Sequence, residues 1–189
     1  MMATNQADPA PPHPDVRLTP TSVIVLGLIS MTGQATPYEL KQAVAASVGN
    51  FWSLPHAQLY AEPARLARAG LLDEQVESGG RRRKTYRVTP VGHAALGRWL
   101  AEPTGTYTEL RDPGLLKLYF GADRGPLARA QLDAHRAKLA EYEELMRSVG
   151  PTLPPGPRLA LRSGIGHERE WVQFWSEVVR EAGPDPGDG

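Results

Sequence analysis

The segment 72–89, LDEQVESGGRRRKTYRVT, constrains the fold more than any other part of this chain of 189 residues. Its central Gly-Gly pair is typical of the tight turn of a β-hairpin, because glycine readily adopts the left-handed backbone conformations that such turns require. The residues on either side predict one strand over 72–77 and a second over 84–89. Four consecutive cations, at 81–84, would then lie at the tip of the hairpin.

Three helices are predicted ahead of the hairpin. The first, in TSVIVLGLISMTG, is apolar over most of its circumference, which indicates a buried helix, and Gly33 suits its C-terminal cap. The second begins at Thr36, which forms a capping box with Glu39, and Pro37 suits the first helical position. Gly49 is predicted to end this second helix.

A third helix is predicted within WSLPHAQLYAEPARLARAGLL. Ser53 is its expected cap, and Leu59 and Leu66 form its inward face. Pro63 lies in its interior, where proline removes one backbone hydrogen bond and costs about 3 kcal/mol. We therefore expect a kink after Tyr60 or a break in the helix.

Three short helices followed by a hairpin are the element order of a winged helix-turn-helix domain. The hairpin is the wing, and a further helix is predicted to start at Thr89 and Pro90. The third helix is the one that such domains place in the major groove of DNA.

The C-terminal segment predicts two long helices with apolar seams. In the first, the positions from Ala128 to Val149 alternate spacings of four and three, which is a heptad pattern, and the last helix repeats it from Leu161 to Ala182. The short loop GPTLPPGP between them predicts an antiparallel pair, and two pairs are expected to meet across a dimer axis. The predicted dimer contacts are Leu132, Leu139, Tyr142, Met146, Val172, Trp175 and Val179.

The predicted fold class is mainly α, a winged helix-turn-helix domain followed by a C-terminal antiparallel helical dimerisation region. The DNA-binding domain is expected over 20–103 and the dimerisation domain over 104–183. The proline-rich segment 1–19 and the segment 184–189 are predicted to be disordered tails, because neither can bury much apolar surface.

The formal net charge is zero, but the charge is unevenly distributed. Residues 22–99 contain nine Lys and Arg against five Asp and Glu, whereas residues 100–189 contain eleven against fourteen. This asymmetry favours a polyanionic partner for the first half only. The absence of cysteine excludes disulfides and thiolate chemistry. There is no apolar run of membrane-spanning length and no secretory leader, so we expect no membrane partner and a cytoplasmic location.

Seven short motifs occur in the order of a known family. They are Tyr38-Glu39-Leu40, Phe51-Trp52, Leu59-Tyr60, Arg65-Leu66, Gly70-Leu71, the segment 80–86, and Thr89 to Gly92. Over residues 22–103 the chain thereby resembles the PadR family of transcriptional regulators, and LLKLYFG, at 115–121, is similar to the helical region that follows in that family. One departure is that Pro63 stands three residues after Tyr60, where many members have proline directly after the tyrosine. The resemblance implies a wing that lies against DNA.

Predicted DNA contacts come from the wing and from two helices. Arginine and lysine neutralise phosphates, and glutamine and histidine read base edges. A solvated surface remains an alternative for these polar residues, and Tyr38 and Tyr60 are also compatible with core packing. Arg83 and Lys84 are expected to differ, because successive strand residues point to opposite faces. The predicted contacts are Tyr38, Lys41, Ser53, His56, Gln58, Tyr60, Arg81, Arg82, Arg83 and Lys84.

Three tryptophans are candidates for a ligand site. Trp99, Trp171 and Trp175 either pack in the core or at the dimer interface, or they line an aromatic pocket. Packing is the favoured interpretation, and the resemblance supplies the pocket as the alternative, since some relatives bind flat aromatic molecules near the dimer centre. No two of the five histidines have metal-ligand spacing, and no catalytic motif is present. No metal, cofactor or catalytic site is therefore expected.

The resulting hypothesis is a sequence-specific transcriptional regulator, a ligand-responsive repressor that binds a palindromic double-stranded operator as a homodimer. Two alternatives remain. In one, the winged helix binds a protein and not DNA. In the other, the protein is a multidrug sensor with an aromatic pocket at the dimer centre.

Overall fold

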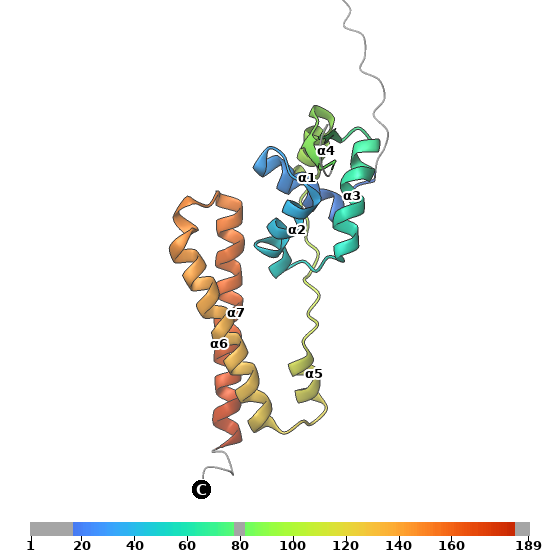
Figure 1. The fold of residues 1–189 in the computed structure, drawn as a ribbon. Coiled ribbons are helices and arrows are strands. Elements are labelled where there is room, and N and C mark those ends of the chain that lie inside the picture. The colour runs from blue at the N-terminus through green and yellow to red at the C-terminus, as the bar shows by residue number, and fades with distance from the viewer. Residues whose placement is uncertain (1–16, 78–81, 184–189) are drawn as a thin grey trace, which may run out of the picture. The chain divides into compact units, whose positions relative to one another are not determined.

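The computed structural model describes residues 17–77 and 82–183. Within them the chain forms two compact units, one that ends at Gly105 and one that begins at Thr106 (Figure 1). Unit 1 contains α1 (Pro20–Thr32), α2 (Pro37–Ala45), η1 (Val48–Asn50), α3 (His56–Arg68), β1 (Leu72–Val76), β2 (Lys84–Val88) and α4 (Pro90–Ala101). Unit 2 contains α5 (Pro113–Tyr119), α6 (Arg124–Ser148), η2 (Gly150–Thr152) and α7 (Pro155–Ala182). The predicted fold class is confirmed.

A threonine followed by a proline begins three of the four α-helices of unit 1. Each threonine hydroxyl accepts a backbone N–H three residues later, at 3.2 Å for Thr19, 3.2 Å for Thr36 and 3.0 Å for Thr89. The proline takes the first helical position, where its missing N–H is not needed. The capping box predicted for Thr36 and Glu39 is confirmed.

The connection from α2 to α3 differs from the prediction. Helix α2 ends at Ala45, and Gly49 lies in the separate turn η1. The Ser47 hydroxyl donates to the Ala43 carbonyl at 2.6 Å and so occupies an acceptor that a longer helix would use. Helix α3 begins at His56, capped by Pro55 and not by Ser53, because the residue before a proline is disfavoured in the helical conformation.

Pro63 lies inside α3, which runs without interruption from His56 to Arg68. The predicted break is therefore wrong. Pro63 is fully buried, and burial of its ring offsets the backbone hydrogen bond that the ring removes.

The wing is a two-stranded antiparallel sheet in which Leu72 pairs with Val88 and Val76 pairs with Lys84. Ala35, between α1 and α2, forms a further bridge with Tyr86 through two backbone hydrogen bonds of 3.1 and 2.9 Å. This bridge fastens the wing to the start of the helix-turn-helix motif.

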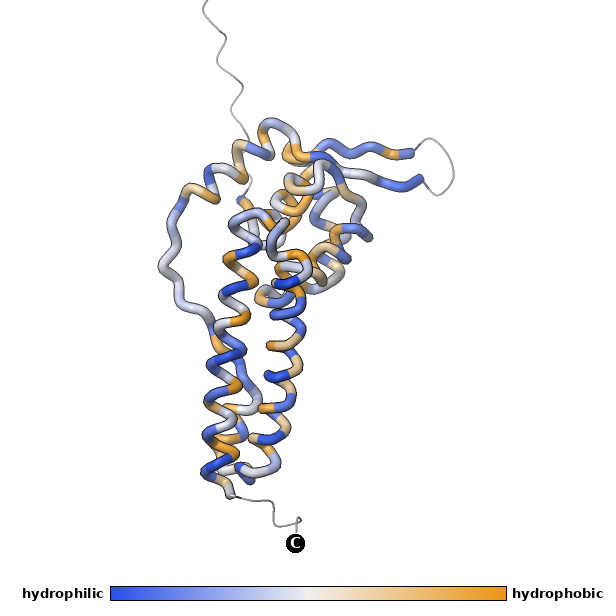
Figure 2. The backbone as a smooth tube through the Cα atoms, turned by 90° about the vertical axis from the view of Figure 1, so that its left-hand side faces the viewer, coloured by the Kyte–Doolittle hydropathy of each residue, from blue (hydrophilic) through white to orange (hydrophobic). Residues whose placement is uncertain are grey.

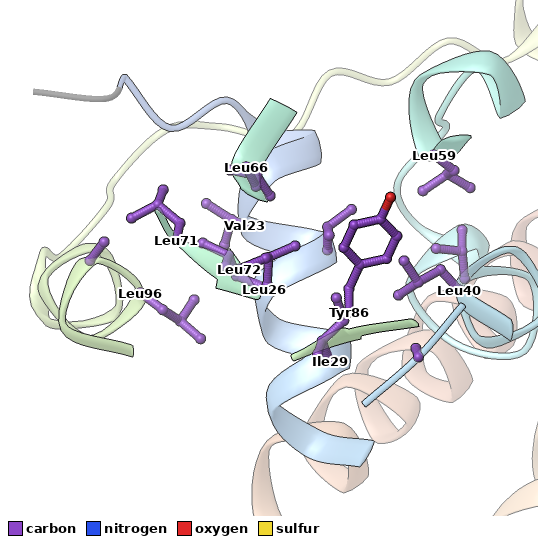
Figure 3. Packing of buried hydrophobic residues seen from close by; sticks show 14 residues of the cluster. Val23, Leu26, Ile29, Leu40, Leu59, Leu66, Leu71, Leu72, Tyr86 and Leu96 are labelled. Carbon is purple, nitrogen blue, oxygen red and sulfur yellow. The ribbon is translucent and has the colours of Figure 1, made fainter. Parts of the chain in front are cut away.

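Tyr86 lies at the centre of the core of unit 1, with Leu26 and Leu40 nearby (Figure 3). The buried face of α1 is centred on Val25, Leu26 and Ile29, whereas Met31 of the same helix is exposed. An almost wholly apolar helix leaves its orientation undetermined by periodicity, so the packing partners decide which side faces inward. The inward positions predicted for Leu59 and Leu66 are confirmed.

Helices α6 and α7 pack along each other as the predicted antiparallel pair (Figures 1 and 2). Their contact is close at Gly164, where an added Cβ would lie 3.1 Å from the Tyr142 ring. A second apolar cluster, around Ala128, Leu132 and Trp175, is buried between α6 and α7. No helix in the described ranges is both long and apolar enough to cross a membrane.

Candidate nucleic-acid interface

Two of the three wing cations that the structure describes form ion pairs within unit 1. The Arg83 guanidinium lies 2.7 Å from a carboxylate oxygen of Glu39 on α2. The Lys84 ammonium lies 2.8 Å from Glu74 on the neighbouring strand. The two cations thus turn to different partners, as the alternation of strand side chains predicts.

Arg82 is different from its neighbours. It is exposed and has a φ of 49°, in the left-handed region, which is uncommon for a residue with a side chain. Within the part of the chain that the structure describes, its side chain has no hydrogen-bond or ion-pair partner. Arg81 lies outside the described residues.

The Glu39 carboxylate joins the wing to the start of α2. One oxygen accepts hydrogen bonds from the backbone N–H and the hydroxyl of Thr36, at 2.8 and 2.9 Å, and the other accepts from Arg83 at 2.7 Å. The Thr36 N–H, the Thr36 hydroxyl and the Arg83 charge hold the pKa of Glu39 below its ordinary value. Glu39 is therefore ionised at neutral pH, as the pair with Arg83 requires.

Glu74 has two partners, one charged and one neutral. Hydrogen bonds from Lys84 and then from the Tyr86 hydroxyl lower the pKa of Glu74. Burial, together with the bond to Glu74, raises the pKa of Tyr86 to about 12. Tyr86 thus stays protonated over the physiological range and donates to Glu74 at 2.8 Å.

Tyrosines and wing cations line one shallow depression of about 520 Å³. Tyr38 is 60% exposed and Tyr60 is 49% exposed, so neither is a core residue. The Gln42 amide donates to the Tyr38 hydroxyl at 3.2 Å. The lining residues come from the start of α2, from α3 and from the wing; they are Thr36, Pro37, Tyr38, Glu39, Gln42, Tyr60, Arg83 and Lys84.

The other predicted DNA contacts are dispersed around α2 and α3. Lys41 is exposed on α2, and Ser53 is exposed ahead of α3. His56 is the first residue of α3. The Gln58 side-chain oxygen accepts a hydrogen bond of 2.8 Å from the buried Thr21 hydroxyl, so α1 holds this side chain while it remains exposed.

A buried polar network fixes α3 against α1. The Ser22 hydroxyl donates to Glu62 at 2.6 Å and accepts from Arg65 at 2.9 Å, and Arg65 also binds Glu62 directly at 2.6 Å. Burial by itself would raise the pKa of Glu62, but the hydrogen bonds from Arg65 and Ser22 lower it overall. The network orients the helix that carries Gln58 and Tyr60.

The predicted dimer residues divide into two groups. Leu132, Tyr142 and Trp175 are buried within the α6–α7 pair of one chain. The others are partly exposed, namely Leu139, Met146, Val172 and Val179. The apolar residues that unit 2 leaves uncovered lie elsewhere, and Tyr119 and Phe120 at the end of α5 are 84% and 76% exposed.

The three candidate ligand-binding tryptophans do not share one unit. Trp99 is exposed on α4, whereas Trp171 and Trp175 belong to α7. Trp171 stacks on His135 with the ring centroids 5.7 Å apart, and it lies 6.4 Å from the Trp175 ring. Trp175 is fully buried, and its indole nitrogen is the one fully buried side-chain nitrogen or oxygen without a hydrogen-bond partner in the described ranges.

Sequence reasoning missed the acidic partners of the wing. Glu39 was recognised only as a helix cap, and Glu74 only as a strand residue. The strand register carries the missing signal for Glu74, since it sets Glu74 opposite Tyr86 on the face that also carries Lys84. The exposed apolar end of α5 was visible in the sequence as the run LLKLYFG.

A winged helix-turn-helix unit with a cationic wing, followed by a helical unit built on the α6–α7 pair, is the architecture of a winged-helix transcriptional regulator. The family comparisons agree. Residues 25–98 match the model of the Transcriptional regulator PadR-like family, and residues 110–182 match that of the Virulence activator alpha C-term. The domain over residues 25–98 is thus one of the PadR-like family of transcriptional regulators.

Individual relatives give the same picture. The chain is 28% identical over 170 residues to the negative transcriptional regulator PadR of Bacillus subtilis, an alignment that covers 82% of this chain and 93% of the relative. A crystal structure of the same Bacillus protein in complex with operator DNA matches the fold with a TM-score of 0.78 at 22% identity, over 88% and 99% of the two chains. Its structure in complex with p-coumaric acid matches with a TM-score of 0.68 at 22% identity, over 89% and 100%.

Proposed function

We propose that this regulator is a homodimeric, sequence-specific DNA-binding repressor whose activity responds to a small aromatic ligand. The observation that carries the proposal is the depression where exposed Tyr38 and Tyr60 meet the cationic base of the wing. The depression joins α2, α3 and the wing, which are the elements that winged helix-turn-helix domains apply to DNA. Its function is regulation of transcription and not catalysis.

In this proposal α3 enters the major groove and the wing meets the adjacent backbone. Ala57 and Ala61 are exposed on α3 and offer methyl groups to thymine methyls, while Gln58 offers its amide to base edges. Tyr38 and Lys41 contact phosphates at the start of α2. A protein that binds chromosomal DNA is expected in the cytoplasm.

Dimerisation follows from the exposed apolar residues of unit 2. Tyr119 and Phe120, together with Leu116, are too exposed to contribute to the fold of one chain, and a second copy would cover them. Two copies related by a two-fold axis present two α3 helices and thus require a palindromic operator.

The ligand proposal rests on the aromatic cluster of α7. Phe174 packs edge-to-face on Trp175 with centroids 5.0 Å apart, and Trp171 stacks beside them. A ligand that prefers one arrangement of the dimer changes DNA affinity by its difference in affinity for the two arrangements. The complex of the Bacillus relative with p-coumaric acid indicates the class of compound to test first.

The test is fluorescence anisotropy with the DNA upstream of the protein's own gene, across a salt series. The expected result is nanomolar binding that weakens steeply with salt, with much weaker binding to a scrambled duplex of equal composition. A variant with residues 81–84 all changed to alanine should bind more weakly and with a shallower salt slope. Equal affinity for the two duplexes would contradict sequence-specific binding, and binding that ignores both salt and the variant would favour a protein partner.

A further inference from the structure

The three wing cations that the structure describes, Arg82, Arg83 and Lys84, differ in whether they have an ion-pair partner. Arg83 and Lys84 each have a carboxylate within 2.8 Å, supplied by Glu39 and Glu74. Arg82, beside them in the chain, is exposed and has no partner within the described ranges. A cation that is already neutralised by a carboxylate neutralises no phosphate unless it exchanges its partner.

We infer that Glu39 is a positioning residue for DNA binding: it holds the exposed Arg83 side chain in an ion pair at the start of α2, so that Arg82 and not Arg83 contacts phosphate. The inference rests on the proposed function and assigns separate roles within its DNA-facing surface. Glu74 holds Lys84 in the same manner on the other face of the wing.

Within the Arg83–Glu39 ion pair, hydrogen bonds hold the Glu39 carboxylate in place. Its carboxylate is anchored by two hydrogen bonds from Thr36, one of them from a backbone N–H. Arg83 contributes the third bond and so fastens the base of the wing to α2. The Glu77 N–H donates to the Arg83 carbonyl at 3.0 Å, which holds the Arg83 backbone in the hairpin as well.

The Arg83–Glu39 ion pair affects DNA binding through the charge of Glu39. Glu39 lines the same depression as Tyr38 and Tyr60, so an uncompensated carboxylate there would repel phosphates. Arg83 cancels that charge. Removing Arg83 therefore weakens DNA binding even though its guanidinium touches no phosphate, and removing Glu39 as well restores binding.

The experiment is a double-mutant cycle in anisotropy salt series, with Arg83→Ala, Glu39→Gln and the double variant beside Arg82→Ala. Glutamine still caps α2 at this position, which preserves the fold. We expect R83A to weaken binding, the double variant to return to near wild-type affinity, and both to keep the wild-type salt slope. R82A should lower the slope by about 0.9, the value for one lost phosphate contact, and E39Q should not restore it.

Asp73→Asn is the matched control, because Asp73 is an exposed acid of the wing with no ion-pair partner among the described residues. If D73N restores the DNA affinity of R83A as fully as E39Q does, then removal of any nearby negative charge explains the rescue, and the inference is wrong. A drop in slope for R83A equal to that for R82A, without rescue by E39Q, would also overturn it. Failure of the wild type to bind any duplex at low salt would instead refute the proposed function, and the inference with it.

A measurement without DNA tests the pair itself. Nuclear magnetic resonance titration of the Glu39 carboxyl should show a higher pKa in R83A than in the wild type, because the positive partner is lost. An unchanged pKa would show that Arg83 does not pair with Glu39 in solution. The inference would then be wrong, independently of the results of the DNA-binding measurements.

Discussion

One hydroxyl, that of Tyr86, links the hydrophobic core to the wing. The Tyr86 ring is 1% exposed in the centre of unit 1, while its hydroxyl reaches Glu74, which in turn binds Lys84. A buried tyrosine hydroxyl needs such a partner, because an unsatisfied one costs about 1–3 kcal/mol. The position of Lys84 is therefore set partly from inside the core.

Changing Tyr86 to phenylalanine should lower the free energy of unfolding at pH 7 by about 1 kcal/mol, because one buried hydrogen bond is lost. The native pKa of Tyr86 is raised from 10.0 to about 12, so its contribution is fully present below pH 10 and is lost as pH rises toward 12. Urea unfolding of both proteins from pH 7 to 12 measures this. The stability advantage of the wild type should shrink above pH 10, and a constant advantage would contradict the assignment.

The Ser22 hydroxyl should matter more than its size suggests. Ser22→Ala removes hydrogen bonds to Glu62, to Arg65 and to the Thr19 N–H. We therefore expect the free energy of unfolding to fall by about 1–3 kcal/mol. The lowered pKa of Glu62 stabilises the fold above the ordinary carboxyl pKa, and this stability is lost as pH falls through the native value. Thermal unfolding of wild type and S22A between pH 7 and 3 should give curves that converge in acid. A difference that stays constant across that range would show that Ser22 does not act through Glu62.

At the scale of elements, α4 packs against the sheet through a glycine. A Cβ at Gly92 would lie 2.1 Å from the Leu71 carbonyl oxygen and 2.8 Å from a Val88 methyl carbon. At Gly97, in the same helix, a Cβ would meet nothing within 4 Å.

Gly92→Ala should therefore destabilise the protein by about 3 kcal/mol or more, since backbone and side chains must move apart. Gly97→Ala is the matched control and should stabilise it by up to about 1 kcal/mol, because alanine is the better helix former. Denaturant unfolding of both variants decides the matter. Similar changes in the two would mean that α4 does not contact Leu71 closely.

Local signals in the sequence predicted the elements well where a single residue determines the backbone. Thr36 and Gly33 are such residues, since Thr36 caps the start of α2 and Gly33 caps the end of α1, whereas Gly49 does not end α2. Pro63 was misleading, because its local cost is offset by burial that only the folded chain supplies. The start of α3 was misplaced because Pro55 outweighs Ser53 as a boundary.

The candidate site was only partly predictable from the sequence, because some of its contacts form only in the folded chain. Residue type and position in the hairpin marked Arg82, Arg83 and Lys84 as a group. Their division depends on the contact between Arg83, just ahead of β2, and Glu39 of α2, which joins residues 44 positions apart and leaves no local pattern.

At the scale of the whole molecule, the proposed binding to a palindromic operator requires a dimer. Changing Tyr119 and Phe120 together to serine should convert the dimer to monomer and weaken operator binding, because both side chains are exposed in one chain and are expected to be buried between two. Leu100→Ser, at an exposed position of unit 1, is the control and should change neither property. Sedimentation velocity reports the assembly, and an unchanged dimer in the double-serine variant would place the interface elsewhere.

Sequence-specific binding by a two-fold symmetric dimer is tested most directly by selecting binding sequences from a random DNA pool and sequencing them. A two-fold symmetric winged-helix dimer predicts two inverted half-sites whose centres lie about 10–10.5 base pairs apart, or a multiple of that. An R82A protein should select the same half-sites, because phosphate contacts position the protein without specifying sequence. Enrichment of a single unpaired half-site, or no enrichment above the starting pool, would contradict the account.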